Sequence, residues 1–123
     1  MANYLTALAV ACVLGWTAAA QTPATPACLH GPGETPAQAA RRRAALDLAR
    51  KVNTTEVQAH FQGHTYYAIS DLPGLASEVN GFKVQLSTDG ATYTFSVKDT
   101  LDGCGFAYFS DQEGVIYSAA PIR

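Results

Sequence analysis

Residues 82–98 read FKVQLSTDGATYTFSVK, and this stretch decides the fold. Apolar and polar residues alternate on both sides of Asp89-Gly90. Alternation with a period of two is typical of a strand with one buried face, and Asp-Gly favours a two-residue hairpin turn. That turn would set three apolar pairs opposite one another: Leu86 and Tyr93, Val84 and Phe95, and Phe82 and Val97. All six then share one face, so the sequence predicts an amphipathic antiparallel hairpin.

A second alternating stretch, residues 104–118, reads CGFAYFSDQEGVIYS. Phe106 and Tyr108 precede the acidic segment 111–114, and Val115 and Tyr117 follow it. Its last residue is a glycine, which suits the left-handed position of a three- or four-residue connection. We therefore expect a second hairpin, and with it an antiparallel sheet of three to four strands.

Before the sheet, residues 37–61 read AQAARRRAALDLARKVNTTEVQAHF, a composition that favours helix. Thr35 and Pro36 are a typical helix start, and Gly63 is expected to end it. An apolar stripe has helical spacing: Ala45, Leu48, Ala49, Val52 and Ala59. The basic residues are expected to point away from it: Arg41, Arg42, Arg43, Arg50 and Lys51. Residues 53–55 weaken the middle of the helix and are expected to kink or break it.

These elements predict an α+β domain over residues 37–123, in which one long amphipathic helix packs on the antiparallel sheet. Residues 64–80 predict a compact loop bent at Pro73-Gly74. Tyr66 and Tyr67 in this loop are candidates for an exposed aromatic binding patch. The alternative is that they fill the gap between the loop and the sheet.

Residues 1–20 read MANYLTALAVACVLGWTAAA. The apolar run is too short to span about 30 Å of hydrocarbon, and Ala18 and Ala20 give a small-x-small cleavage pattern. This is typical of a secretory signal peptide. Two alternatives remain, an uncleaved apolar tail and a lipoprotein route with acylation at Cys12. We expect a secreted or periplasmic product that has no stable membrane span after signal cleavage.

Cleavage after Ala20 would leave Cys28 and Cys104, and an oxidising compartment allows them one intramolecular disulfide. The loop closed by this disulfide, about 76 residues, corresponds to roughly 4 kcal/mol of stabilisation. Two free thiols or an intermolecular disulfide are the alternatives. Cys28 lies in residues 21–36, QTPATPACLHGPGETP, which hold four of the six prolines and predict a flexible or extended linker.

The composition narrows the classes of partner. The chain has 123 residues, with 8 basic and 10 acidic side chains and a formal net charge of −2. This length suits one domain with one modest core. The balanced charge does not favour nucleic acid or an anionic membrane surface, so we expect no nucleic-acid partner.

Five segments together resemble the globular part of bacterial type IV pilins and type II secretion pseudopilins: RKVNTTEVQAHF, YYAISDLPGL, GFKVQL, YTFSV and CGFAYFSDQEGVIYS. Pilins commonly carry an aromatic-x-x-Asp-x-x-Gly-hydrophobic phrase in a late strand, which Asp111, Gly114 and Val115 match. The resemblance implies a helix laid across a three- or four-stranded sheet. The apolar pilin helix with a glutamate at its fifth position has no counterpart here, so we expect a pilin-like head without the filament-forming segment.

No set of residues predicts catalysis, and we expect no enzyme, cofactor or metal. His60 and His64 have a zinc-compatible spacing, but no third ligand is evident, and we interpret them as surface histidines. The late acidic residues Asp99, Asp102, Asp111 and Glu113 are interpreted as solvated turn residues, although carboxylates at turns can bind Ca²⁺.

The sequence favours a secreted interaction module that acts through protein–protein contacts. The candidate surfaces are an unpaired sheet edge and the 64–80 loop, and the candidate residues are Tyr66, Tyr67, Asp111 and Glu113. The alternative function is binding of a small ligand or metal in the periplasm or outside the cell.

Overall fold

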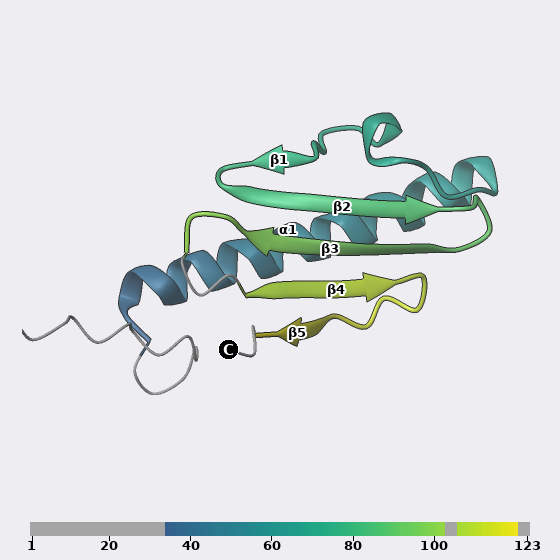
Figure 1. Ribbon diagram of the computed structural model, residues 1–123. Coiled ribbons are helices and arrows are strands. Elements are labelled where there is room, and N and C mark those ends of the chain that lie inside the picture. The colour runs from purple at the N-terminus through teal and green to yellow at the C-terminus, as the bar shows by residue number, and fades with distance from the viewer. Residues whose placement is uncertain (1–33, 103–105, 121–123) are drawn as a thin grey trace, which may run out of the picture.

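The structure is a computed structural model that describes residues 34–102 and 106–120. One helix lies across one face of an antiparallel sheet whose strand order is β1-β2-β3-β4-β5 (Figure 1). The elements are α1 (Pro36–Gly63), a 3₁₀ turn η1 (Ile69–Asp71), β1 (Glu78–Val79), β2 (Phe82–Thr88), β3 (Tyr93–Asp99), β4 (Ala107–Asp111) and β5 (Tyr117–Ala119). The α+β class is confirmed. The expected strand number of three to four is wrong, because the described sheet has five strands.

Helix α1 begins and ends where local chemistry favours it. The Thr35 hydroxyl accepts the N–H of Gln38 at 3.2 Å, and the Gln38 amide oxygen accepts the N–H of Thr35 at 3.0 Å. This reciprocal cap satisfies two helix-end donors. At the other end His64 adopts a left-handed conformation (φ 55°) and donates its N–H to the His60 carbonyl at 2.7 Å.

Residues 53–55 do not break the helix, because α1 is continuous from Pro36 to Gly63. Asparagine is a poor helix former, and the hydrogen bonds of the Asn53 side chain explain why it is tolerated here. Its amide oxygen accepts the Tyr93 hydroxyl at 2.7 Å, and its amide nitrogen donates to the Ser110 hydroxyl at 2.9 Å. These bonds to β3 and β4 outweigh the weak helix propensity of asparagine.

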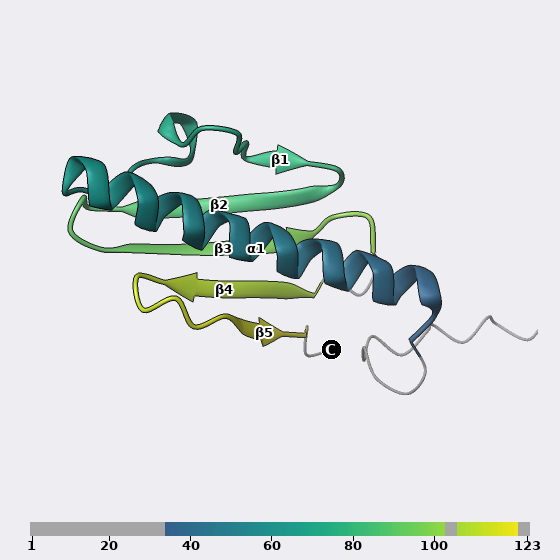
Figure 2. The same ribbon diagram turned by 180° about the vertical axis from the view of Figure 1, so that it is seen from behind.

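The core lies between α1 and the sheet (Figure 2). Ala45, Ala49 and Val52 from the predicted stripe are fully buried, whereas Leu48 and Ala59 are half-buried. The small alanines allow the helix to approach the sheet closely. The sheet contributes larger side chains: Phe82, Val84, Tyr93, Phe95, Val97, Phe106 and Tyr108.

The predicted register of the β2–β3 hairpin is wrong by two residues. Leu86 pairs with Phe95 and Val84 with Val97, so the connection spans residues 89–92. The Asp89 carboxylate accepts the N–H groups of Ala91 at 2.9 Å and Thr92 at 2.7 Å, which stabilises this four-residue turn. A shift of two residues leaves every side chain on its original face, so the predicted amphipathic hairpin is confirmed.

The β4–β5 hairpin also has a longer connection than expected. Phe109 pairs with Tyr117, and residues 112–116 link the two strands instead of three or four residues. Val115 consequently lies in the connection, where it is exposed. Tyr117 shares the face of Phe109, on the side of the sheet away from α1.

Arg41 was expected to point away from the core, but it does not. Its guanidinium donates to both carboxylate oxygens of Asp99, at 2.6 and 2.7 Å, and lies 4.4 Å from the centre of the Phe82 ring. Asp99 is buried, so its interpretation as a solvated turn residue is wrong as well. The ion pair ties the N-terminal half of α1 to the end of β3.

Candidate functional site

The face of the sheet away from α1, here called the outer face, is the strongest candidate for a functional surface. Its side chains alternate along the strands with the buried ones. No element covers this face in the described part of the chain (Figures 1 and 2). Its members on β2 to β5 are Lys83, Gln85, Ser87, Thr94, Ser96, Lys98, Ala107, Phe109, Asp111, Tyr117 and Ala119.

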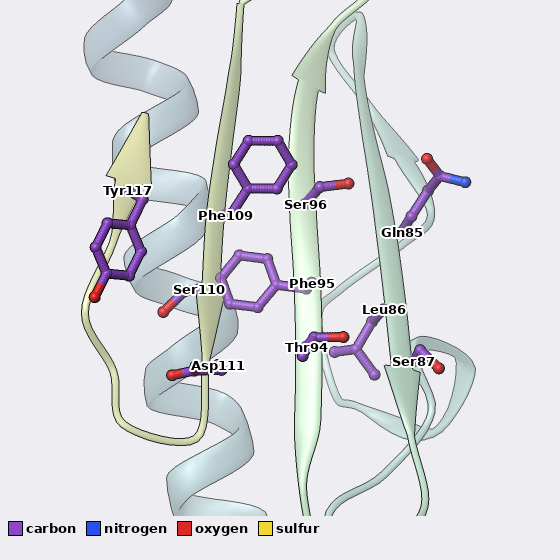
Figure 3. Close-up of a pocket in the computed structure, with 10 residues that line it drawn as sticks. All are labelled: Gln85, Leu86, Ser87, Thr94, Phe95, Ser96, Phe109, Ser110, Asp111 and Tyr117. Carbon is purple, nitrogen blue, oxygen red and sulfur yellow. The ribbon is translucent and has the colours of Figure 1, made fainter. Parts of the chain in front are cut away.

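Strand register arranges these side chains in rows across the sheet. The middle row runs Gln85, Ser96, Phe109, Tyr117, each directly opposite the next. Phe109 and Tyr117 are 42% and 59% exposed, although they are neighbouring aromatic side chains. Figure 3 shows this row from the outer face, with α1 behind the sheet. An exposed aromatic pair on an otherwise polar face marks this part of the surface as a candidate for binding.

A shallow hollow of about 610 Å³ follows the middle row and the row beside it, which contains Ser87, Thr94 and Asp111. Phe109 and Tyr117 form its aromatic wall, and the apolar residues Leu86 and Phe95 also line it (Figure 3). The uncharged polar residues of the lining are Gln85, Ser87, Thr94, Ser96 and Ser110. Asp111 adds an acidic residue to the lining of the hollow. The hollow is broad and open, so it fits a flat partner better than a deeply enclosed small molecule.

The outer face is net basic at one end and acidic at the other. Lys83 and Lys98 are directly opposite each other in one row, and Glu78 of β1 is directly opposite Lys83 at the edge of the same row. This row remains net basic, because it carries two lysines and one glutamate. Asp111 lies at the other end, opposite Thr94. The two turns at that end carry Asp89 and Glu113. The uncharged middle row separates the basic end from the acidic end.

The structure divides the four predicted interaction residues between two regions. Asp111 lies on the outer face, and its carboxylate accepts the N–H of Glu113 at 3.0 Å, which fixes the turn. The Glu113 residue is exposed. Tyr66 and Tyr67 follow α1 and are both half-buried. The sequence pattern had no means of showing this division, because it depends on how the 64–80 loop folds back.

Tyr66 fills the gap between the loop and the sheet, as the alternative interpretation held. Its ring stacks on His60, with centroids 4.3 Å apart, and meets the edge of Tyr93 at 4.7 Å. Its N–H donates to the Gly90 carbonyl at 2.9 Å. Burial raises the pKa of Tyr93 to about 12, so its hydroxyl stays protonated and donates to Asn53.

Glu56 is a buried carboxylate that the sequence analysis did not single out. It is fully buried, and one oxygen accepts the N–H of Tyr67 at 3.1 Å. Within the described chain the other oxygen has no hydrogen-bond partner. Burial raises the pKa of Glu56, against the opposing effects of the Tyr67 N–H and the His60 charge. Its position four residues after Val52, on the apolar stripe, was the signal that could have revealed it.

The two histidines have separate structural roles. The His60 ring packs on Tyr66, and His64 is the C-cap of α1. Within residues 34–102 and 106–120, no three histidine, cysteine or acidic side chains form a cluster that could hold a metal ion. In the same residues no helix has the length and apolar character needed to cross a membrane.

The predicted signal peptide, the predicted Cys28–Cys104 disulfide and nearly all of the predicted linker lie outside the described residues. They therefore stay predictions. At the described start of the chain, the Glu34 carboxylate accepts two hydrogen bonds from the Arg42 guanidinium, at 2.9 and 3.0 Å. This pair fixes residue 34 against the first turns of α1.

Comparisons with protein-family models, with curated proteins and with solved structures found no match to this chain.

Proposed function

We propose that the protein is a secreted, non-catalytic, pilin-like interaction module that binds other proteins through the outer face of its sheet. The observation that carries this proposal is the exposed pair Phe109 and Tyr117 on the uncovered face. Aromatic side chains are enriched in protein interfaces, where they supply much of the binding energy. The signal peptide predicted at residues 1–20 supports export. The helix-on-sheet architecture agrees with the fold that the pilin resemblance implies.

The edge of the sheet beside this aromatic pair extends the proposed contact surface. Strand β5 is the last strand of the described sheet, and its three residues are exposed. An added strand from a partner would pair with the backbone of β5 and place side chains beside Tyr117. Both kinds of contact would therefore use the same corner of the molecule.

Small-ligand binding outside the cytoplasm is the second candidate, and the hollow on the outer face favours it. Its volume of about 610 Å³ lies within the range of ligand sites. The two functions predict different contacts. A small ligand would need the polar groups of Thr94 and Asp111, whereas a protein partner would depend mainly on Phe109 and Tyr117.

Variant-dependent capture tests the proposal. The exported chain would be cross-linked to proteins of its own cell surface and medium, and the captured partners compared by mass spectrometry. We expect Phe109→Ser and Tyr117→Ser to lose partners that the wild type captures. Phe61→Ser is the matched control, because Phe61 is 83% exposed on α1, on the helix side of the sheet. Equal capture by the wild type and all three variants would contradict the proposal.

A further inference from the structure

We infer that the outer face also binds a second copy of this chain, face to face, so that each strand lies over the same strand of the second copy and runs in the opposite direction to it. This inference rests on the proposed use of the outer face for protein contact, and it adds the identity of one partner. It is carried by the order of charges along the strands, which makes the face complementary to itself.

The symmetry of the contact follows from the three rows. The two-fold axis would lie midway between the two faces, perpendicular to the strands, and would run along the row of Phe109 and Tyr117. The rotation places the Lys83–Lys98 row of each copy over the row that contains Asp111 in the other copy. A two-fold interface uses the same patch on both subunits, so each lysine–aspartate contact would occur twice. Facing sheets pack about 10 Å apart, a gap that lysine and aromatic side chains can bridge.

Charge selects this orientation over its alternative. An axis parallel to the strands would place each row over the same row of the second copy, so the two lysine rows would face each other and the two Asp111 carboxylates would lie in facing rows. Both ends of the contact would then bring like charges together. With the perpendicular axis, the Asp111 carboxylate of the second copy approaches Lys98. Lys83, the neighbour of Lys98, already has Glu78 directly opposite it in the single sheet, so Lys98 is the lysine that gains most from the second copy.

The uncharged middle of the face is also suited to a copy of itself. Ser96 in the middle row is small, and so are Ala107 and Ala119, which continue the row of Lys98, so these positions present no bulky side chains that would keep two flat sheets apart. Phe109 and Tyr117 would meet the same residues of the second copy near the axis. The charged groups are solvent-exposed, and the middle row contains the polar residues Gln85 and Ser96. We therefore expect weak association that decreases with added salt.

A charge-swap experiment tests this geometry by sedimentation velocity of the full exported chain over a concentration series. Lys98→Glu and Asp111→Lys each create two repulsive contacts in a dimer of identical chains, so each should weaken association about tenfold or more. In an equimolar mixture, Glu at position 98 would face Lys at position 111, and Asp111 of one variant would face Lys98 of the other. Mixing the two variants should therefore restore association to the level of the wild type.

Two controls keep the experiment decisive. Asp111→Asn removes the charge but keeps an oxygen to accept the N–H of Glu113, so it separates the loss of charge from damage to the turn. Phe61→Ser should associate like the wild type, and far-UV circular dichroism would show that each variant is folded. Phe109→Ser should abolish association.

Two results would overturn the inference: a wild type that stays monomeric up to about 1 mM, or variants that remain monomeric after mixing. Neither result touches the proposed function, whose test is the capture of a different protein that depends on Phe109. Conversely, a dimer that follows the charge-swap pattern supports this inference even where no other protein is captured.

Discussion

Replacement of Asp99 by asparagine would test whether one buried carboxylate holds the N-terminal half of α1 on the sheet. Asp99 is 1% exposed and accepts two bonds from Arg41 and one each from the N–H groups of Leu101 (2.9 Å) and Asp102 (3.1 Å). Asparagine keeps the shape but removes the charge. Hydrogen bonds to buried charged groups contribute about 1.5–3 kcal/mol each. The Arg41 side chain is 30% exposed, so water screens the pair. We therefore expect the free energy of unfolding at pH 7 to fall by about 2 kcal/mol.

The pH dependence of this loss gives the more specific result. Burial acts to raise the pKa of Asp99, but hydrogen bonds from Arg41 and the following backbone N–H groups outweigh it and lower the pKa below 3.8. A carboxyl with a lowered folded-state pKa contributes stability above its unfolded-state pKa and loses it as pH falls through the folded-state value. The difference between the wild type and Asp99→Asn should thus be largest near neutrality and shrink below pH about 4.

Urea unfolding followed by circular dichroism, repeated from about pH 7 to pH 2.5, measures this difference. Asp47→Asn is the matched control, because Asp47 forms an exposed pair with Arg50 at 3.0 Å. Its effect should stay below about 0.5 kcal/mol. A loss at Asp99 that is no larger than the loss at Asp47, or one that persists undiminished in acid, would refute the reasoning.

Three further predictions concern other parts of the molecule. Glu56→Gln should stabilise the protein by roughly 1 kcal/mol at pH 8 in urea unfolding, because the raised pKa of Glu56 makes its stability contribution greatest below pH 4.5 and reduces it as pH rises through the folded-state value. Gly81→Ala should lower the melting temperature more than Gly114→Ala, because both glycines have positive φ but, of the two, only Gly81 has a side chain with which a new Cβ would collide. Each substitution should lower the free energy of unfolding by about 1 kcal/mol or more. Equal losses of melting temperature would contradict this prediction. Alkylation of the exported protein should find no free thiol at Cys28 or Cys104 until a reductant is added, and reactive thiols without reductant would exclude the disulfide.

The sequence was sufficient to predict the faces of the strands but not their partners. Alternation is unchanged by a shift of two residues, so it could not choose between a two-residue and a four-residue turn at Asp89-Gly90. The hydrogen bonds of the Asp89 side chain made that choice. The two-residue turn is formed by Asn80-Gly81 instead, with φ of 50° and 78°. Strand β1, with two residues, is too short for alternation to reveal it.

The candidate site was predictable to a similar extent. Phe109 follows Tyr108, and once Tyr108 is placed inside, its neighbour must face outward. The position of Tyr117 beside Phe109 depends on the length of the connection, which the pattern did not fix. Arg41 is one of three consecutive arginines, and its partner Asp99 is 58 residues away. No local signal distinguishes it from its neighbours, because the choice is made by tertiary contact.

The order of the strands has a consequence for how the chain folds. Each strand pairs with the next one along the chain, so the sheet can assemble through successive short-range closures. Helix docking instead requires contacts such as Asn53 with Ser110, which are 57 residues apart. Closing these longer loops costs more chain entropy than closing the hairpins, so we expect the hairpins of the meander to form before the helix docks.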